Sequence, residues 1–515
     1  MNCIWNSAST MVRMRAVAAV TLLCLLPGFR GLMAQADNET IVHPDTVRQV
    51  IRGFGAANIV GWRPDMTADQ ADKAFGTGDG QIGFSILRLK VPSVSTRQEF
   101  SAQLATARLA QSYGAIVIAS PWSPPAGMKT NNNIVGGELE ESAYPDFADH
   151  LNAFADFMAD NDAPLYAISV QNEPDITVNY ESCDWNASQM LKFVKEQGAS
   201  IGTRLIVPES FNFNKAISNA ILNDPDAAAH VDIIGGHLYG GGLEAYPLAE
   251  RMGKELWMTE YLNTDTTWNA VLSTGRQMHD CMNAGMNAYI WWYIVRYYGP
   301  IHENGNVTKR GYVMSQYARF IRPGFVRVRT ASGRGPALSI TAYKGGSRLV
   351  VVVVNTRTTE ITRTFRIEGA PAGTAVFTPV VTSQTRNCAQ ESGLTATDGV
   401  FTATLAPSSV TTFVADILSG LDGSSVLPGK LRLDPNFPNP FNPRTAVTIE
   451  LPRACAASLK VYNLLGAEVA TLLDGRRGAG RHDLAFDASG LASGTYVLRL
   501  EADGAVLTRK MTLLR

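Results

Sequence analysis

Short apolar runs alternate with amphipathic segments over residues 51–321. The runs are typical of strands that are buried on both faces, and the segments between them, such as residues 144–160, have helical spacing. Eight strand–helix units over roughly 270 residues predict a (β/α)8 TIM barrel, an α/β fold. A doubly wound open sheet is the alternative, but no dinucleotide fingerprint follows the GFG near residue 54. The eight runs are RGFGAANIV, GFSILRLKV, GAIVIASPW, LYAISVQNE, RLIVPES, VDIIGGHLY, ELWMTEY and AYIWWYIV.

The pattern changes after residue 321. Residues 322–416 hold short apolar strands separated by turn residues, for example RLVVVVVN and VFTATLAP, which is typical of a β-sandwich. Residues 37–50 also resemble a strand, and we expect them to join the sandwich from the other end of the chain. Residues 417–432 are rich in Gly and Ser and predict a linker. Residues 433–515 predict a second, smaller all-β domain with an Ig-like sandwich.

The N-terminus has the pattern of a secretory signal peptide rather than of a folded segment. Arginines precede an apolar run that ends in small residues, and Pro27 interrupts the run. The run is short for a membrane span. We therefore expect residues 1–36 to be removed on export, with an uncleaved membrane anchor as the alternative.

Charge and cysteine content exclude several classes of function. Lys and Arg number 45 against 46 Asp and Glu, so nothing favours a nucleic-acid partner. Beyond the signal peptide, the cysteines are widely spaced, without a CxxC or a Cys/His cluster. The spacing predicts neither a disulfide framework nor a zinc site, although a single disulfide stays open. These four are Cys183, Cys281, Cys388 and Cys455.

Polar and aromatic side chains gather where the predicted barrel strands end. The carboxyl ends of barrel strands carry the catalytic groups in this fold, so we expect these side chains to share one pocket. In chain order they are Arg88, Trp122, Asn172, Glu173, His237, Tyr239, Glu260, Trp292, Arg296 and Tyr298.

Two of these residues are carboxylates on different strands. Glu173 follows the fourth strand and Glu260 ends the seventh. Glycoside hydrolysis requires a carboxylic acid to protonate the leaving oxygen and a second carboxylate across the sugar ring. The pair therefore predicts a glycosidase. Glu209 by itself is expected to be solvated or salt-bridged, or to support the pair from behind.

The sequence around both glutamates resembles glycoside hydrolase family 30. VQNEPD and WMTEY resemble its acid/base and nucleophile motifs, and GFGAANIVGW, ASPWSPPAGMKTN, YIWWYI and RFIRPG follow in the family's order. The resemblance covers about residues 45–415. It implies a TIM barrel with an appended β-sandwich to which both ends of the barrel contribute.

The resemblance also implies roles for individual residues. Glu173 would be the general acid/base and Glu260 the nucleophile, while Asn172 would bind the sugar 2-hydroxyl and Tyr239 would touch the nucleophile. Arg88 would help to keep Glu260 ionised, and Glu173 should have a raised pKa. Trp122 and Trp292 are expected to stack on sugar rings. His237 is either a sugar contact or a packed structural histidine. We expect neither a metal nor a cofactor.

The loop after the last barrel strand resembles that of the bacterial glucuronoxylanases of family 30, the subfamily 8 group. In those enzymes an Arg-x-Tyr motif binds the carboxylate of a glucuronic acid substituent on xylan, and Arg296 and Tyr298 match this motif. The alternative is that Arg296 pairs with a protein acid at the barrel rim. Val295 stands where many members have another arginine. The loop after Glu260 is shorter than the usual one in that group, and Thr264 and Trp268 are the candidates for the remaining contacts with the glucuronic acid.

The C-terminal domain resembles the type IX secretion sorting domain. NFPNPFNPRTAVTIELP, VYNLLGAEVATLLDG and FDASGLASGTYVLRLEADG carry this resemblance. It implies that the type IX machinery exports the protein to the cell surface or the medium. A carbohydrate-binding β-domain is the alternative from composition alone.

We therefore predict a secreted, monomeric, retaining endo-β-1,4-xylanase that acts on glucuronoxylan. Within the same family, a xylanase independent of glucuronic acid, a β-1,6-glucanase or a β-glucosidase is the alternative. A non-catalytic glycan-binding barrel is the alternative from another class. The presence of both glutamates weighs against it, because an inactive barrel is expected to have lost one of them.

Overall fold

The computed structural model describes two stretches of the chain. The first comprises residues 38–417 except 95 and 333–337. The second comprises residues 431–513 except 434, 435, 437, 438, 452–454, 478, 479 and 503. The expected signal peptide and residues 418–430 of the expected linker lie outside the described residues.

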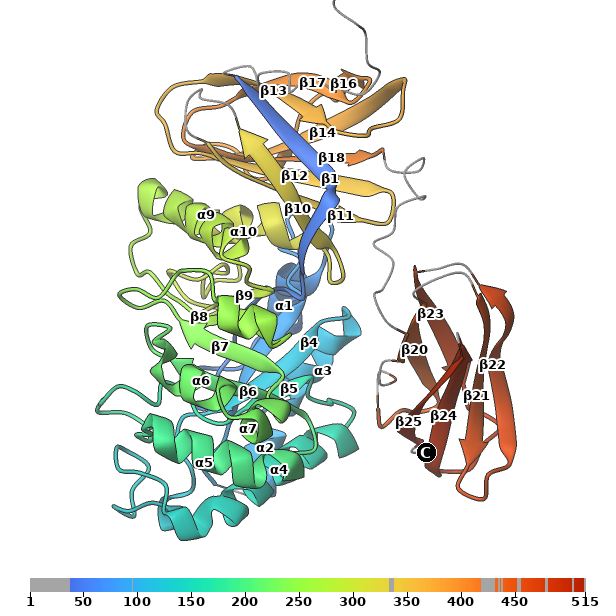
Figure 1. Cartoon of the computed structure of the whole chain (residues 1–515). Coiled ribbons are helices and arrows are strands. Elements are labelled where there is room, and N and C mark those ends of the chain that lie inside the picture. Colours follow the sequence, from blue (N-terminus) through green and yellow to red (C-terminus); the bar gives the residue numbers. More distant parts are fainter. Residues whose placement is uncertain are drawn as a thin grey trace, which may run out of the picture.

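Eight parallel strands close into a barrel, which confirms the predicted fold (Figure 1). Each strand pairs with the next in chain order, and the last pairs with the first. The strands are β2 (Gly53–Ala57), β3 (Ile86–Val91), β4 (Ile116–Pro121), β5 (Ala167–Ser169), β6 (Arg204–Ser210), β7 (Ile233–His237), β8 (Glu255–Glu260) and β9 (Ala288–Trp291).

Helices connect the strands and cover the outside of the barrel. Two of them begin with a capping box. The side chain of Thr67 or Asn186 accepts from the backbone N–H of a Gln three residues later, and the side-chain oxygen of that Gln accepts from the backbone N–H of the Thr or Asn. The helices are α1 (Ala68–Phe75), α2 (Arg97–Ser101), α3 (Leu104–Ser112), α4 (Tyr144–Asp160), α5 (Ala187–Gln197), α6 (Lys215–Leu222), α7 (Pro225–Ala229), α8 (Pro247–Arg251), α9 (Trp268–Asn283) and α10 (Lys309–Ala318).

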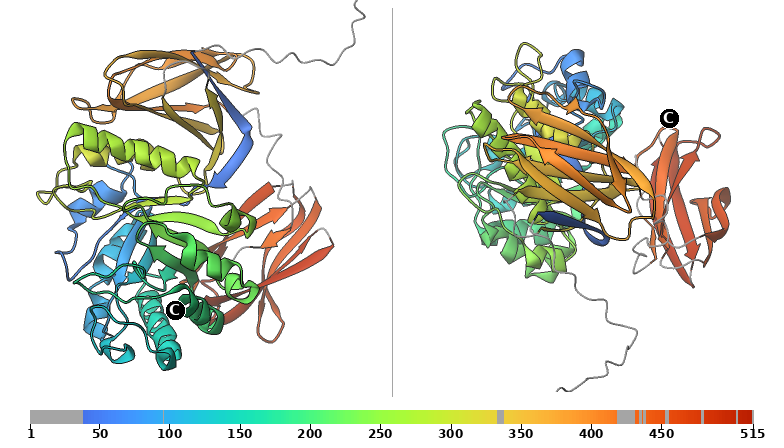
Figure 2. Two further views of the ribbon diagram at one scale, coloured as in Figure 1. Left: turned by 60° about the vertical axis from the view of Figure 1, so that its left-hand side comes forward. Right: turned by 90° about the horizontal axis from the view of Figure 1, so that it is seen from above.

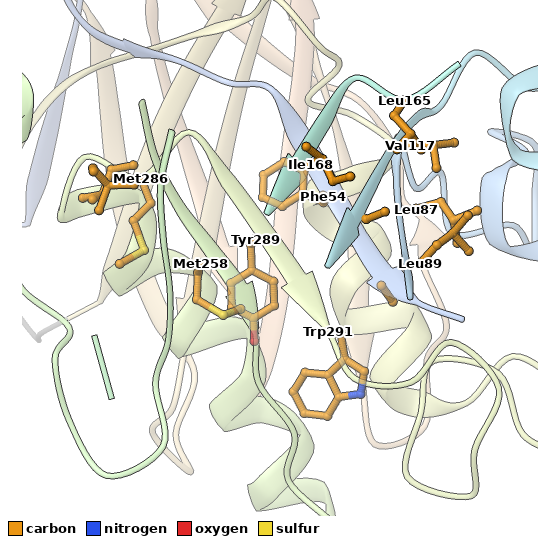
Figure 3. Close-up of a cluster of buried hydrophobic side chains, with 14 of the residues drawn as sticks. Phe54, Leu87, Leu89, Val117, Leu165, Ile168, Met258, Met286, Tyr289 and Trp291 are labelled. Atoms are coloured by element: carbon orange, nitrogen blue, oxygen red, sulfur yellow. The ribbon is translucent and has the colours of Figure 1, made fainter. Parts of the chain in front are cut away.

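Alternate side chains of each strand enter different cores. Ile86 of β3 belongs to a small cluster with Ile118, Ile206 and Trp257 that is separate from the main core. Its neighbour Leu87 belongs to the large cluster between strands and helices, together with the side chains in Figure 3. Because β3 alternates in this way, Arg88 lies on the same side of the strand as Ile86.

A second domain is built from ten strands in one sheet of order β15-β14-β16-β17-β13-β1-β10-β11-β12-β18, which β14 and β18 close by pairing. Its N-terminal strand β1 (Glu39–Val50) lies between β10 and β13. The others are β10 (Val326–Ser332), β11 (Ser339–Gly345), β12 (Arg348–Asn355), β13 (Ile361–Ile367), β14 (Thr374–Ser383), β15 (Ala389–Gln390), β16 (Leu394–Thr397), β17 (Val400–Leu405) and β18 (Ser409–Asp416).

The barrel and the sandwich share a hydrophobic core. In β12, Val350, Val352 and Val354 belong to the large barrel cluster, whereas their neighbours Leu349 and Val351 belong to the sandwich cluster. Helices α9 and α10 lie between the two domains (Figure 1), as the left-hand view of Figure 2 also shows. The RLVVVVVN run is continuously apolar because β12 is buried on both faces.

The C-terminal domain consists of two small sheets around a core of its own. One has the order β19-β20-β23 and the other β22-β21-β24-β25. The strands are β19 (Arg432–Leu433), β20 (Arg444–Leu451), β21 (Cys455–Asn463), β22 (Glu468–Arg477), β23 (Gly480–Asp487), β24 (Gly494–Ala502) and β25 (Ala505–Leu513). The four cysteines of the described residues are free thiols. None of the helices in the described ranges has the length and hydropathy needed to cross a membrane.

Candidate active site

A cleft of about 430 Å³ opens at the carboxyl ends of the barrel strands. Both predicted glutamates line it, and aromatic side chains form most of its wall. Such a wall suits sugars, since flat rings cover the C–H faces while a few polar groups hold the hydroxyls. The lining residues are Trp62, Trp122, Glu173, Tyr180, Phe211, Tyr239, Glu260, Leu262, Trp292 and Tyr293.

Glu173 and Glu260 approach each other across this cleft. Glu173 follows β5 with a φ of +47°, an uncommon left-handed conformation for a residue other than glycine. Glu260 is the last residue of β8. One oxygen from each carboxyl group and Nδ1 of His237 all lie within 4.8 Å of one another. This spacing agrees with retaining glycosidases, whose carboxyl groups are about 5–5.5 Å apart.

Arg88 lies beneath the pair and is completely buried. Its guanidinium donates to Glu260 Oε2 at 2.6 Å, to Asn172 Oδ1 at 2.7 Å and to Ser120 Oγ at 3.2 Å. It also lies 3.2 Å from Oε1 of the buried Glu209. We expected Arg88 to share the substrate pocket and to lie beside Glu260. The structure directs its donors to protein groups, so that it orients Glu260 and Asn172.

Glu209 is a buried, ionised partner rather than a solvated residue. Its side chain is fully buried against Arg88 and lies 4.0 Å from His237 Nε2. Burial alone would raise its pKa, but the charges of Arg88 and His237 lower that pKa well below its ordinary range. Of the three interpretations left open, the solvated residue is not observed; Glu209 is paired with Arg88, which in turn holds Glu260.

His237 ends β7 and lies between the carboxyl groups. Its Nδ1 is 2.9 Å from Glu173 Oε1 and 3.9 Å from Glu260 Oε1, and its side chain is fully buried. Burial by itself lowers its pKa, but Glu260, Glu173 and Glu209 together raise it to about 9. His237 therefore contacts the carboxyl groups as an imidazolium, which fits a buried structural role better than a sugar contact.

Two tyrosines complete the hydrogen bonding of the pair. Tyr239 donates to Glu260 Oε1 at 3.0 Å, and its ring stacks between Phe211 and Tyr261 at 5.0 and 5.6 Å. Tyr180 donates to Glu173 Oε2 at 3.2 Å from the loop after β5. Tyr180 is 42% exposed, so this contact lies at the mouth of the cleft.

The ionisation of Glu260 depends on opposing effects. Burial raises its pKa above the ordinary value, and Glu173 adds to that rise, whereas His237 and Arg88 oppose it. Arg88 thus acts in the direction that we expected, but burial is the larger effect. Glu173, His237 and Glu260 are also spaced like metal ligands. The positive charges of Arg88 and protonated His237 would repel a metal cation at this place, so they disfavour a metal site.

The aromatic wall contains both predicted tryptophans and several residues that sequence analysis missed. The rings of Trp122 and Trp292 are 5.5 Å apart, and Trp62 packs edge-on against them at 5.3 and 6.1 Å. Trp62 lies in the loop after β2 and Tyr180 in the loop after β5. The rule that loops after barrel strands build the site indicates these two loops, but not which of their side chains point into the cleft.

Arg296 and Tyr298 lie on the loop after β9. The guanidinium of Arg296 is 3.1 Å from Oε1 of Glu303 and lies over the rings of Tyr297 and Tyr298 at 5.6 and 5.9 Å. This is the alternative considered above, a pair with a protein acid at the rim. Trp268 does not line the cleft, because its indole N–H donates to the backbone of Ser408 in the sandwich.

The catalytic part of the chain and its C-terminal domain each resemble known proteins. The chain is 39% identical over 426 residues to the glucuronoxylanase XynC of Bacillus subtilis (strain 168), a match that covers 78% of this chain and 99% of that protein. The crystal structure of the family 30 subfamily 8 xylanase Xyn30A from Clostridium acetobutylicum is 37% identical, with a TM-score of 0.70. The match covers 74% of this chain and all of that one.

A second crystal structure, the family 30 endoxylanase from Clostridium papyrosolvens C71, is 37% identical with a TM-score of 0.68. That match covers 73% of this chain and all of the other. Residues 436–513 match the secretion system C-terminal sorting domain. The chain therefore belongs to glycoside hydrolase family 30, subfamily 8, and carries a C-terminal sorting domain.

Proposed function

We propose that this protein is an exported, retaining endo-β-1,4-xylanase that cleaves glucuronoxylan by double displacement. The observation that carries the proposal is the pair Glu173 and Glu260, closely spaced in an aromatic cleft. The names of its relatives, a glucuronoxylanase and two xylanases, support xylan as the substrate class.

In the first step, Glu260 attacks the anomeric carbon while Glu173 protonates the leaving oxygen. Arg88 and Tyr239 hold one oxygen each of Glu260, which orients the nucleophile toward the cleft. Asn172 accepts from Arg88 through Oδ1, so its amide nitrogen stays available to a hydroxyl oxygen of the sugar.

In the second step, Glu173 removes a proton from water, which then hydrolyses the glycosyl–enzyme. Glu173 must therefore exist in both protonation states within one cycle. The Tyr180 hydroxyl suits this change, because a phenol can donate to the ionised carboxylate and accept from the protonated one. His237 donates to the other oxygen of Glu173 and limits its rotation.

The finer proposal is that Arg296 and Tyr298 bind the glucuronic acid branch. A guanidinium is suited to a carboxylate, and binding energy from a side branch can be used to place the scissile bond over the two glutamates. Arg296 is 24% exposed at its side chain and so remains accessible from the rim.

Product mass spectrometry after digestion of glucuronoxylan and, separately, of an arabinoxylan free of uronic acid tests the proposal. We expect glucuronoxylan to give xylo-oligosaccharides that each carry one uronic acid, and Glu260→Gln to give none. Equal digestion of both polymers to neutral products would contradict the role of Arg296. No digestion of either would contradict a xylanase.

The C-terminal domain supplies the route of export. It matches a secretion system sorting domain and has its own hydrophobic core. The protein is therefore delivered outside the cell, where polymeric xylan is accessible. We propose that the catalytic part needs the type IX machinery only for this delivery.

A further inference from the structure

The loop after β9 holds a carboxylate of the protein against the same guanidinium that is proposed to bind a uronic acid. Arg296 Nη1 lies 3.1 Å from Glu303 Oε1, and the Glu303 side chain is 45% exposed. A uronic acid offers the chemical group that Glu303 already presents. The two carboxylates therefore cannot both be close to Arg296 without repelling each other.

The backbone of the loop builds this pairing. The Arg296 N–H donates to the Ile301 carbonyl at 2.9 Å, which joins the two arms of the loop. Beyond Ile301, the bond from the His302 N–H to the Asn306 carbonyl at 2.9 Å closes a turn. Glu303 lies on that turn, so its position opposite Arg296 follows from the loop fold and not only from attraction between two mobile side chains.

The charge of Glu303 is maintained in this setting. Burial of part of the side chain would raise its pKa, but backbone hydrogen bonds, Arg296 and His302 lower it below the ordinary value. His302 Nδ1 lies 3.7 Å from Oε2, the other oxygen of the carboxylate. The same surroundings therefore favour the ionised form of Glu303.

We propose that Glu303 is a specificity-determining residue that competes with the uronic acid branch for Arg296. This inference rests on the proposed recognition of a uronic acid by Arg296. In the free enzyme Glu303 neutralises Arg296, and the branch must displace it on binding. Because exposed ion pairs are weak, displacement is possible, but it reduces the preference for branched substrate by up to roughly fivefold.

Steady-state kinetics of Glu303→Gln test the proposal. The substrates are a xylo-oligosaccharide with one glucuronic acid branch and the same oligosaccharide without it. We expect KM for the branched substrate to fall by roughly fivefold with little change in kcat, so that the preference for branched substrate rises. Glu391→Gln is the matched control, because Glu391 forms an exposed pair with Arg386 on the sandwich and lies away from the cleft.

Arg296→Gln, alone and combined with Glu303→Gln, separates the possible outcomes. If Glu303→Gln raises the preference while Arg296 is present but has no effect in the Arg296→Gln background, which itself lacks the preference, competition for Arg296 is supported. If Glu303→Gln leaves the preference unchanged while Arg296→Gln abolishes it, the proposal is overturned. If Arg296→Gln lowers the preference but Glu303→Gln lowers it too, Glu303 positions Arg296 and the proposal is overturned. If Arg296→Gln changes nothing, uronic acid recognition itself fails, and the role of Glu303 fails with it.

Discussion

Among single residues, Arg88 and His237 are the cations that balance the negative charge at the bottom of the cleft. These two cations face three buried carboxyl groups, those of Glu173, Glu209 and Glu260. Because a net buried charge is costly, the two cations offset most of the negative charge that these carboxyl groups can bring into the cleft.

Substitution of each glutamate should separate the two proposed roles. We expect Glu173→Gln to lower kcat on xylan by about 10²–10⁴-fold, since general acid–base catalysis contributes about that much. With an aryl xylobioside, whose leaving group needs no protonation, the first step should be nearly preserved. Glu260→Gln should be inactive on both substrates, because it lacks the nucleophile.

Stopped-flow release of the aryl group measures this first step directly. Glu140→Gln serves as the control, because Glu140 is exposed and its side chain lies outside the cleft. An equal loss of aryl release in Glu173→Gln and Glu260→Gln would contradict the assignment of roles.

The raised pKa of His237 predicts a dependence of stability on pH. A histidine titrates near 6.5 in the unfolded chain and, here, at about 9 in the folded protein. Its contribution to the free energy of unfolding is therefore complete below pH 6.5 and is lost as pH rises through 9. The loss should be on the order of 3 kcal/mol.

Thermal unfolding between pH 6 and pH 9.5 measures this loss. In His237→Gln the corresponding decline in Tm should be absent, whereas His302→Gln, which replaces a half-exposed histidine on the β9 loop, should retain it. A decline of the same size in His237→Gln would show that other groups cause it.

At the scale of elements, irregular strand ends aim the side chains of the site. The β6–β7 register shifts between Pro208 and Ser210, and the β7–β8 register shifts between Gly236 and His237, so that His237 pairs with Glu260. Such a bulge changes the direction in which the next side chain points, and bulges are frequent beside active sites. The shift brings the imidazole and the nucleophile to the same level of the barrel.

Close approach of β7 to the segment after β6 depends on Gly236. A Cβ at this position would lie 2.4 Å from the ring of Phe213. We expect Gly236→Ala to displace that ring and to destabilise the protein by about 1–3 kcal/mol, as overpacking does. Activity should fall as well, since His237 is the next residue.

Differential scanning calorimetry and kcat/KM on xylan measure both effects. Gly127→Ala is the matched control, because a Cβ at Gly127 would meet nothing within 4 Å. If Gly236→Ala unfolds at the same temperature as Gly127→Ala, the close packing of β7 is not needed.

At the scale of the whole molecule, the sandwich belongs to the catalytic unit and the C-terminal domain does not share its core. Val350, Val352 and Val354 of β12 belong to the same hydrophobic core as the buried faces of α9 and α10. The strand β1, which precedes the barrel in the chain, pairs within the sandwich sheet. The core of the C-terminal domain contains only its own side chains.

Two truncations test this division. A chain of residues 38–417 should retain kcat/KM on xylan and a single cooperative unfolding transition. A chain of residues 38–321 should aggregate or unfold at a much lower temperature, because the buried faces of α9 and α10 would be exposed. A folded, active 38–321 fragment would show that the barrel is independent of the sandwich.

The sequence indicated the strands and the main catalytic candidates for different reasons. Continuous apolar runs indicate strands buried on both faces, and the alternation with helices indicates a parallel barrel. Glu173 and Glu260 were found because strand ends meet at one face of such a barrel. Trp62 and Tyr180 were missed because loop residues have no periodicity that shows which way they point.

The barrel, the sandwich, the C-terminal domain and the two glutamates could thus be predicted from the sequence, because periodicity and the succession of strands can be read along the chain. The fold was needed to show that His237 contacts the carboxyl groups rather than the sugar, and that Arg88 holds Asn172 and Glu209 as well as Glu260. It alone also paired Arg296 with Glu303. Which groups a buried charged side chain contacts depends on all the charges around it, and those charges come from strands and loops that are far apart in the chain.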